Sequence, residues 1–322
     1  MPRVSVIIPC YNSGGSLGEA VNSVLAQTYQ DFEMIVVDDA STEPIADSLL
    51  RCDSRLRYLR RETNGGVAPA RNDGIRASTG EYVCFLDGDD LYLPGRLERG
   101  VAFLEHNPTL WAVHGDCEIR GPAGQVLAGS MIAASGCRKR LLTWRDIARH
   151  EPLHTNTITL RRRCFDAAGL FDESLRRGQD SEMWLRLSYH YPIAQLPEVV
   201  AIWHRRETRW RATVIARRAI AVWHAVTTWL PGARAKDLKF ANTRLARAYW
   251  RLALALHLGR DPQAARARRQ AVFHCLSNRL ATHLLGGLAW WSAGVVWGWA
   301  SKRAHSSAPL GNGGPASQEL GR

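Results

Sequence analysis

Short apolar runs alternate with segments of helical spacing over the first half of the chain. Four runs rich in β-branched and aromatic residues predict buried strands at residues 4–8, 32–37, 56–59 and 82–86. Apolar residues at helical spacing predict helices at residues 16–27, 44–50, 69–77 and 97–105. Strands that alternate with helices indicate a mostly parallel, Rossmann-like α/β sheet flanked by helices.

The first predicted helix has a recognisable start signal. Ser16 is placed to cap its N-terminus, and Glu19, three residues later, completes a capping box. Leu17, Val21 and Val24 then supply the apolar face that packs on the sheet. The sequence therefore predicts a helix that begins at Ser16.

The pattern is less regular after residue 105 and becomes wholly helical after residue 212. Further strands are predicted at residues 111–119, 125–128 and 157–160, and a helix at residues 181–189. Ala, Arg, Leu and Trp at helical spacing then predict three or four helices across residues 213–300. We expect an α/β domain at residues 1–210, a basic, Trp-rich helical region at 211–304 and a disordered tail at 305–322.

Composition limits the class of protein. With 322 residues, 46% hydrophobic and 22% charged, the chain resembles a soluble globular protein and not a disordered, collagen-like or polytopic membrane chain. Its seven cysteines are scattered without a CxxC pair, which predicts neither a disulfide framework nor a zinc site. The apolar run before Pro9 is too short for a signal peptide. We therefore expect a cytoplasmic protein.

Charge is distributed unevenly along the chain. Residues 1–200 hold 22 basic and 26 acidic residues, whereas residues 201–322 hold 20 basic and 4 acidic ones, together with nine of the twelve tryptophans. Basic charge mixed with Trp suits a peripheral contact with anionic lipid, as at the inner face of the plasma membrane, although a nucleic-acid groove shares this composition. The uncharged segment 284–300 is compatible with an interfacial helix, a helix packed on the protein or a membrane span.

Polar residues gather where the predicted strands end. Pro9, Tyr11 and Asn12 follow the first strand, Asp38 and Asp39 follow the second, and residues 87–90 (Asp-Gly-Asp-Asp) follow a later one. Ligands of open parallel sheets bind outside the carboxyl ends of the strands, so these groups should meet in one cleft. An Asp-x-Asp pair can hold Mg²⁺ or Mn²⁺ with a substrate diphosphate, although an acidic turn and helix-capping aspartates are the alternatives.

The order and spacing of these segments resemble the family-2 glycosyltransferases, inverting nucleotide-sugar transferases with a GT-A fold. Six blocks carry the resemblance, at residues 4–12, 27–33, 36–42, 64–72, 80–82 and 85–90, with Pro94 after the last. The resemblance extends over about residues 3–204. It implies a GT-A sheet with residues 1–210 as the catalytic domain.

The resemblance also implies roles for individual residues. Those expected to bind the nucleotide sugar are Pro9, Tyr11, Asn12, Asp38, Asp39, Gly66, Arg71, Asp87 and Asp90. Asp87 and Asp89 would form the metal-binding DxD pair for Mg²⁺ or Mn²⁺. For Arg71, an ion pair on a helix surface is the alternative.

A second motif implied by the resemblance supplies a catalytic base. Residues 178–187 resemble the family's Glu-Asp motif, with Gln179 where Glu is usual and Asp180 in the position of the base. A carboxylate there would take the proton of the attacking acceptor hydroxyl. A helix N-cap is the alternative role for Asp180.

Together these features predict a metal-dependent inverting glycosyltransferase. It would move a hexose from a nucleotide diphosphate, with UDP as the expected nucleotide, to a hydroxyl of a cell-surface glycan or lipid-linked acceptor. The alternatives are a non-catalytic nucleotide-sugar binder and a nucleic-acid-binding protein, the latter disfavoured because unmetallated carboxylates repel phosphate. Nucleotidyl transfer usually needs a basic, Gly-rich loop after the first strand, and residues 9–15 contain no basic residue.

Overall fold

The computed structural model describes residues 1–43, 45–46, 49, 53–205, 212–230, 235–258, 261, 263–277 and 287–289. Segment 284–300 therefore lies outside the described residues except for 287–289, and the tail 305–322 lies outside them entirely. The chain divides into two compact units, residues 1–209 with 221–232 and residues 210–220 with 233–322. Among the helices that the structure describes, none combines the length and the apolar character needed to traverse a bilayer.

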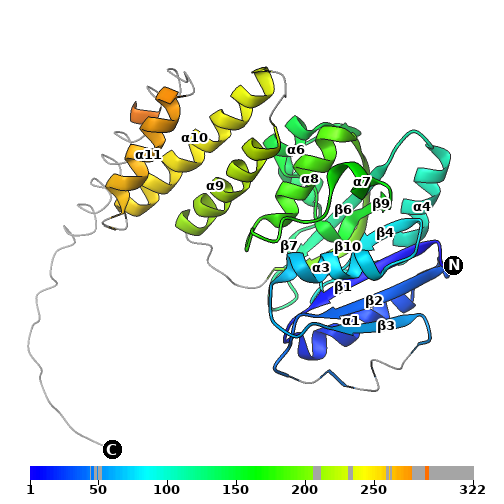
Figure 1. Ribbon diagram of the computed structural model, residues 1–322. Helices are drawn as coiled ribbons and strands as arrows, with labels where there is room; N and C mark the ends of the chain where they lie inside the picture. The colour runs from blue at the N-terminus through cyan, green and yellow to red at the C-terminus, as the bar shows by residue number, and fades with distance from the viewer. Residues whose placement is uncertain are drawn as a thin grey trace, which may run out of the picture. The chain divides into compact units, whose positions relative to one another are not determined.

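The described part of the first unit contains a ten-stranded mixed sheet, in the order β3-β2-β1-β4-β9-β6-β10-β5, with β7 beside β6 and β8 beside β10 (Figure 1). Four strands form its parallel half: β1 (Val4–Cys10), β2 (Phe32–Asp38), β3 (Leu56–Arg60) and β4 (Tyr82–Phe85). The second half contains β5 (Leu91–Tyr92), β6 (Ala112–Arg120), β7 (Val126–Ala128), β8 (Leu141–Leu142), β9 (Ile158–Arg161) and β10 (Ile193–His204). Strand β9 runs antiparallel to both β4 and β6, and β6 is parallel to β10.

Helices cover both faces of the parallel half because its strands are apolar on both faces. On one face, Val4, Val6 and Ile8 of β1 share a core with α1 (Gly14–Leu25) and α4 (Arg96–His106). On the other face lies α3 (Val67–Ala77), so that α1 and α3 are on opposite sides of β1 and β2 (Figure 1).

Helix α3 packs closely on the sheet because of one glycine. A Cβ atom at Gly74 would lie 2.4 Å from Cγ2 of Ile7 and 3.3 Å from Cγ2 of Val37. Any larger residue would push α3 away from the strands. Gly74 thus sets the height of α3 above the sheet, and with it the position of the residues at the start of this helix.

The rest of the first unit packs around α8 (Gln179–His190). Helices α6 (Trp144–His150) and α7 (Cys164–Ala168) pack against it, and α5 (Met131–Ser135) packs against β6. Trp184 of α8 lies in an aromatic cluster with Phe85 and Phe171, with ring centroids 5.4–6.2 Å apart. This cluster joins the end of β4 to the loop before α8.

In the second unit, α10 (Ala235–Leu258) and α11 (Ala264–Ser277) pack against each other. Leu252, Ala253 and Leu256 of α10 form a small core with Ala264 and Ala267 of α11. Helix α9 (Ala212–Trp229) contributes its residues up to 220 to this unit and the remainder to the first.

The predicted fold class is confirmed, and one local prediction was wrong. Helix α1 begins at Gly14, with Ser13 at the N-cap, and not at Ser16. Ser16 Oγ instead donates hydrogen bonds to the carbonyls of Ser13 (2.7 Å) and Gly88 (3.0 Å). Its hydroxyl therefore links α1 to the turn after β4. The predicted helix at 44–50 falls mainly on positions outside the described residues.

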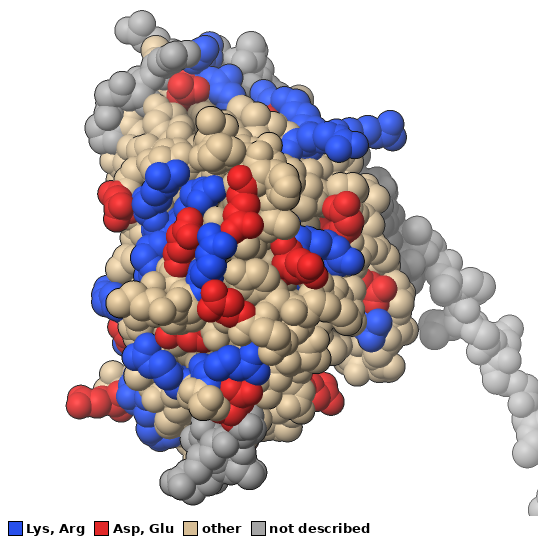
Figure 2. Space-filling model, turned by 90° about the vertical axis from the view of Figure 1, so that its right-hand side faces the viewer, with Lys and Arg blue, Asp and Glu red and all other residues tan. Residues whose placement is uncertain are grey.

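On the face shown in Figure 2, most Lys and Arg side chains adjoin Asp or Glu side chains. In the first unit, ion pairs of this kind join Glu81 to both Arg3 and Arg161, at 3.1 Å each. Such pairing divides the positive charge into small areas over the middle and lower parts of this face, whereas Lys and Arg side chains form a larger blue area near its top (Figure 2).

Candidate active site

A cavity of about 530 Å³ opens where β1, β2 and β4 end. Parallel strands bring their carboxyl ends to one edge, so residues far apart in sequence converge there. Eight of the predicted site residues line the cavity: Pro9, Tyr11, Asp39, Gly66, Arg71, Asp87, Asp89 and Asp180. Asn12, Asp38 and Asp90 are not among the residues that line it.

Three helices begin at this cavity. Ser13 precedes α1, Gly66 precedes α3, and Gln179 is the first residue of α8, and all three residues line it. Backbone N–H groups without a helical partner and the helix dipole make such termini favourable for anions. The cavity therefore presents positive helix ends beside the carboxylates.

Arg71 is a buried cation among the residues that line the cavity. Its side chain is 4% exposed, and Nη2 donates to Oδ1 of Asp87 at 2.6 Å. Its guanidinium carbon lies 5.4 Å from the ring centroid of Phe171. Nε and Nη1 have no hydrogen-bond partner among the described residues. The guanidinium of Arg71 is thus buried and not on the helix surface, whereas its partner Asp87 is 28% exposed at the cavity.

Asn156 shapes the acidic turn after β4. Its side chain is fully buried; Oδ1 accepts from the backbone N–H of Asp87 (3.0 Å), and Nδ2 donates to Oδ2 of Asp90 (2.6 Å). The backbone N–H of His204 donates to the other Asp90 oxygen at 2.7 Å, and His204 Nδ1 donates to the carbonyl of Asp89 at 2.9 Å. Asp90 therefore points into the protein, whereas Asp87 and Asp89 line the cavity.

Burial is the main cause of the raised pKa of Asp90, and the adjacent carboxylates of Asp87 and Asp89 raise it further. The sequence analysis missed Asn156. A single asparagine has no spacing pattern that marks it, and only the packing of the 3₁₀ turn Thr155–Thr157 against the acidic turn reveals its contacts.

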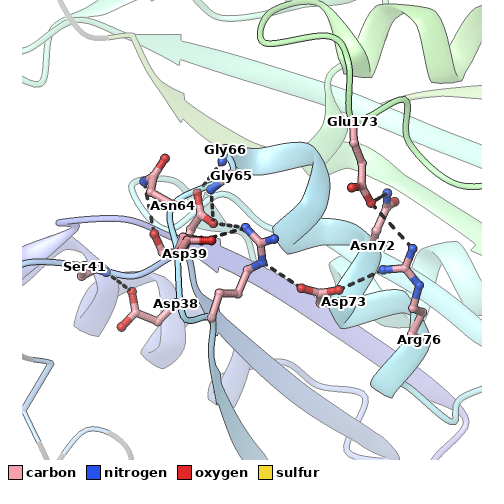
Figure 3. Close-up of polar contacts among 12 residues, drawn as sticks. Asp38, Asp39, Ser41, Asn64, Gly65, Gly66, Asn72, Asp73, Arg76 and Glu173 are labelled. Atoms are coloured by element: carbon pink, nitrogen blue, oxygen red, sulfur yellow. Dashed lines mark hydrogen bonds and ion pairs between the residues drawn. The ribbon is translucent and has the colours of Figure 1, made fainter.

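Asp39 holds the Gly-rich segment before α3. Its carboxylate accepts from the N–H groups of Gly65 (3.0 Å) and Gly66 (2.6 Å) and pairs with Arg61. Figure 3 shows Asp39 facing these two backbone groups, with Asn64 alongside. Gly66 has φ +94°, a conformation that L-residues rarely adopt. Asp39 and Gly66 together place the first turn of α3 at the cavity.

Asp38 and Asn12 fasten the neighbouring loops. Asp38 is fully buried and accepts from Ser41 N (2.8 Å), Tyr58 Oη (2.7 Å) and Arg60 Nη1 (2.8 Å). Burial alone would raise its pKa, but the hydrogen bonds from Ser41 and Tyr58 outweigh burial and lower it. Asn12 Oδ1 accepts from Thr42 N at 2.9 Å. Asp38 therefore holds the loop after β2, and Asn12 joins that loop to the one that carries Tyr11, which is 46% exposed.

Asp180 lies in the first turn of α8. The N-cap of this helix is Gly178, with φ 81°, so the alternative of Asp180 as N-cap was wrong. Asp180 Oδ1 accepts from Ser181 N at 2.8 Å. Gln179 is 7% exposed, and its Oε1 has no hydrogen-bond partner among the described residues. Gln179 and Asp180 are both among the residues that line the cavity.

The loop before α8 is anchored on α3. Asn72 donates to the carbonyl of Phe171 and accepts from its N–H, both at 2.9 Å, and also donates to Glu173 at 2.8 Å (Figure 3). Arg71 and Asn72 are consecutive, so one turn of α3 contacts both the acidic turn and this loop. The same turn of α3 therefore contacts both the turn that carries Asp87 and the loop that leads to Asp180.

His154 lies near the carboxylates of Asp87 and Asp180. Its ring centroid is 4.8 Å from that of Trp203. Desolvation lowers the pKa of His154, although the carboxylates of Asp87 and Asp180 act in the opposite direction. Burial therefore favours the neutral imidazole of His154, which is not among the residues that line the cavity.

The carboxylates suit a hard divalent cation that also binds substrate phosphate. Within the described ranges, no group of three or more His, Cys, Asp and Glu side chains is placed to hold a metal ion by itself. Mg²⁺ and Mn²⁺, however, are usually held by one or two carboxylates with substrate oxygens and water completing the shell. Asp87 and Asp89, adjacent on one turn and both lining the cavity, fit that requirement.

This sheet, with a nucleotide-sized cavity at its carboxyl edge, has the GT-A fold of sugar-nucleotide transferases. Residues 1–349 of Staphylococcus aureus TarS, solved with UDP-GlcNAc, match with a TM-score of 0.63 and 22% identity over 84% of this chain and 81% of that one. The mannosyltransferase PcManGT of Pyrobaculum calidifontis, solved with GDP-Man and Mn²⁺, matches with a TM-score of 0.59 and 22% identity over 95% and 88%. Both similarities are at the level of the fold.

Sequence comparison identifies the family. The chain belongs to glycosyl transferase family 2, whose sequence model matches residues 5–176. An uncharacterised glycosyltransferase of Rickettsia bellii is 34% identical over 58% of this chain and 26% of its own length. Glycosyltransferase GlyG of Streptococcus pneumoniae is 43% identical over 30% of this chain and 33% of its own length. The matched segments span about a quarter to a third of these two relatives.

Proposed function

We propose that this protein is an inverting glycosyltransferase that moves a sugar from a nucleoside diphosphate, with UDP as the nucleotide, to a hydroxyl of a cell-surface or lipid-linked glycan. The observation that carries the proposal is the convergence of Arg71, Asp87, Asp89 and Asp180 on one cavity. The neighbours solved with UDP-GlcNAc and with GDP-Man support a nucleotide-sugar donor.

The donor diphosphate would bind between the acidic turn and the start of α3. Arg71, whose Nη2 already donates to Asp87 at the cavity, would place its positive charge beside the phosphate oxygens. The N-termini of α1 and α3 add unpaired backbone N–H groups on the same side. Tyr11 and Pro9, at the end of β1, would contact the base, and Asp39 would keep the Gly65-Gly66 backbone in place beneath it.

Asp180 would act as the base. As the acceptor oxygen forms its bond to the anomeric carbon, its proton passes to the Asp180 carboxylate. The bond between the anomeric carbon and the phosphate oxygen breaks on the opposite side, and its electron pair leaves with the diphosphate. Attack opposite the leaving group inverts the anomeric configuration.

Asp87 and Asp89 would hold Mg²⁺ or Mn²⁺. When bound, such an ion supplies Lewis-acid stabilisation of the negative charge on the departing diphosphate. Asp90 would keep its contacts with Asn156 and His204 and hold the turn, not touch the metal.

We also propose that the reaction takes place on the cytoplasmic side of the membrane. The six cysteines in the described part of the chain are free and buried, which agrees with a reducing compartment. The basic region 211–304 would then lie near a lipid-linked acceptor.

Thermal shift with nucleotide sugars tests the donor site. The chain is heated with UDP-, GDP-, TDP- and CMP-sugars, each with Mn²⁺ or with EDTA. A ligand at one hundred times its Kd adds about 2.7 kcal/mol to the unfolding free energy. We expect one nucleotide class to stabilise the protein, with loss of the effect in EDTA and in Asp89→Asn.

Asp180→Asn separates binding from transfer. This variant should keep the donor-induced shift but lose release of nucleoside diphosphate in the presence of synthetic prenyl-phosphate-linked sugars. Asp166→Asn is the matched control, because Asp166 is exposed on α7 and is not among the cavity residues. Normal turnover by Asp180→Asn would disprove the base assignment. Donor binding without turnover by the wild type over all acceptors would favour a nucleotide-sugar binder.

A further inference from the structure

Arg71 has one acidic partner for a buried positive charge. Its side chain is 4% exposed, and Asp87, 2.6 Å from Nη2, is the only carboxylate that pairs with it in the described part of the chain. Nε and Nη1 are buried, and no described group accepts a hydrogen bond from them. The guanidinium carbon lies over the ring of Phe171, which carries no full negative charge. Because an unpaired buried charge is strongly unfavourable, Arg71 depends on Asp87 for charge compensation.

Asp87 is also one of the two carboxylates that we propose to hold the metal. Its side chain is 28% exposed and lines the cavity, so the carboxylate is in contact with both the cavity and Arg71. Arg71 already neutralises this carboxylate, so it reduces the attraction that Asp87 exerts on a divalent cation and also repels the cation directly. Arg71 and a metal ion therefore compete for the same negative charge.

A diphosphate in the cavity would relieve this competition. Arg71 and Asp87 line the same cavity as Ser13 and Gly66, the N-caps of α1 and α3, where we propose that the diphosphate binds. Phosphate oxygens there would give the Arg71 guanidinium a second anionic partner and would supply further oxygen ligands for the metal. The buried cation would then stay compensated while Asp87 binds the metal.

We propose that Arg71 is an internal counter-ion of the metal site, which weakens binding of a free divalent cation at Asp87 and makes that binding depend on a diphosphate in the same cavity. This inference rests on the proposed function, from which it takes the metal and the diphosphate. It adds that the protein binds the two together and does not retain the metal after the nucleotide leaves. Because binding linkage is reciprocal, the metal must raise the affinity for the nucleotide by the same factor.

Binding of Mn²⁺ alone to the full chain tests the counter-ion role, measured from the electron paramagnetic resonance signal of free Mn²⁺. Arg71→Met should bind Mn²⁺ at least about 10-fold more tightly than the wild type, because it removes the positive charge and its side chain can still pack on Phe171. Arg71→Lys keeps the charge and should bind as weakly as the wild type. The gain should disappear in the double variant Arg71→Met with Asp87→Asn, which assigns it to this site.

Arg76→Met is the matched control on the same helix. The Arg76 side chain is 55% exposed, and it pairs with Asp73 and Glu173 (Figure 3). It is not among the residues that line the cavity. The control removes the same charge, so its Mn²⁺ affinity should match that of the wild type. The melting temperature of every variant is measured in EDTA, which separates a change in metal binding from a change in folding.

Calorimetric titration with UDP, in EDTA and in excess Mn²⁺, tests the dependence on diphosphate. The wild type should bind UDP about 100-fold more tightly with Mn²⁺, and Arg71→Met about 10-fold or less. The proposal is overturned if Arg71→Met binds free Mn²⁺ no more tightly than the wild type, if Arg76→Met gains as much, or if Mn²⁺ leaves the UDP affinity of the wild type unchanged. If Arg71→Met gains Mn²⁺ affinity but the wild type binds no UDP in either condition, the counter-ion role is supported and the nucleotide proposed above is wrong.

Discussion

Replacing Asn156 with alanine should disable the acidic turn without touching a substrate-contacting residue. The substitution removes the acceptor for the N–H of Asp87 and the donor to the Asp90 carboxylate. The Asp90 carboxylate cannot turn to water, because Asp90 is only 2% exposed. The backbone N–H of His204 remains as a partner for Asp90.

The magnitude follows from the two bonds. A neutral hydrogen bond contributes about 1 kcal/mol and one to a charged group about 1.5–3 kcal/mol. Asn156→Ala should therefore lower the free energy of unfolding by about 2.5–4 kcal/mol. Displacement of catalytic groups by about 1 Å can cost 100-fold in rate, so kcat should fall more than the KM for the donor rises. Asn156→Asp should be worse at neutral pH, because it sets a second carboxylate against Asp90.

Urea unfolding and steady-state kinetics of the three proteins check this argument. Asn22→Ala is the control, since Asn22 is exposed on α1 and the change should stay within about 0.5 kcal/mol. A loss below 0.5 kcal/mol in Asn156→Ala, with kcat unchanged, would show that the turn is held by other contacts.

Two further predictions concern a backbone angle and a buried histidine. Gly66→Ala should destabilise the fold by about 1–3 kcal/mol, measured by urea unfolding, and weaken the donor-induced thermal shift, because φ +94° is strained for alanine; an unchanged shift would place the donor elsewhere. Burial lowers the pKa of His114 to about 4. In the unfolded chain His114 takes up a proton as the pH falls through about 6.5, whereas in the folded chain it stays neutral down to about pH 4. The free energy of unfolding should therefore fall by about 2 kcal/mol from pH 7 to pH 5. His114→Gln should lack this component, and identical pH dependence in both proteins would contradict the assignment.

The parallel half of the sheet could be predicted because each of its strands is marked by consecutive residues in the sequence. Each of β1, β2 and β4 is a short apolar run, and each ends in the polar residues that line the cavity. Strand β10 could not be predicted in this way. Pro197 and Glu198 interrupt its apolar pattern, and its pairing with β6 is irregular between Gln195 and Ala201. Its position depends on β6 and not on its own spacing.

The candidate site likewise contains residues that sequence motifs predict and residues that only the packing of distant segments reveals. Asp39, Arg71, Asp87 and Asp180 carry recognisable motifs, and the structure brings them to one cavity. Asn156 carries none, and the contacts of Asp38 with Tyr58 and Arg60 depend on the pairing of β2 with β3. Sequence indicates which groups could carry the chemistry, whereas the residues that hold them appear only when distant segments pack.

Contacts between distant segments would also connect the two halves of the proposed reaction. The part of the cavity where we propose that the donor binds is built from segments between β1 and β4. The loop before Asp180 is attached to α3 through Asn72, 99 residues away from Phe171. Arg71, the neighbour of Asn72, is bonded to Asp87. A diphosphate that draws Arg71 toward its oxygens would therefore act on the same turn of α3 that holds the loop before the base. If Asp180 is the base as proposed, donor binding and base placement would be linked through one helical turn, and a change at Asn72 should alter turnover more than donor affinity.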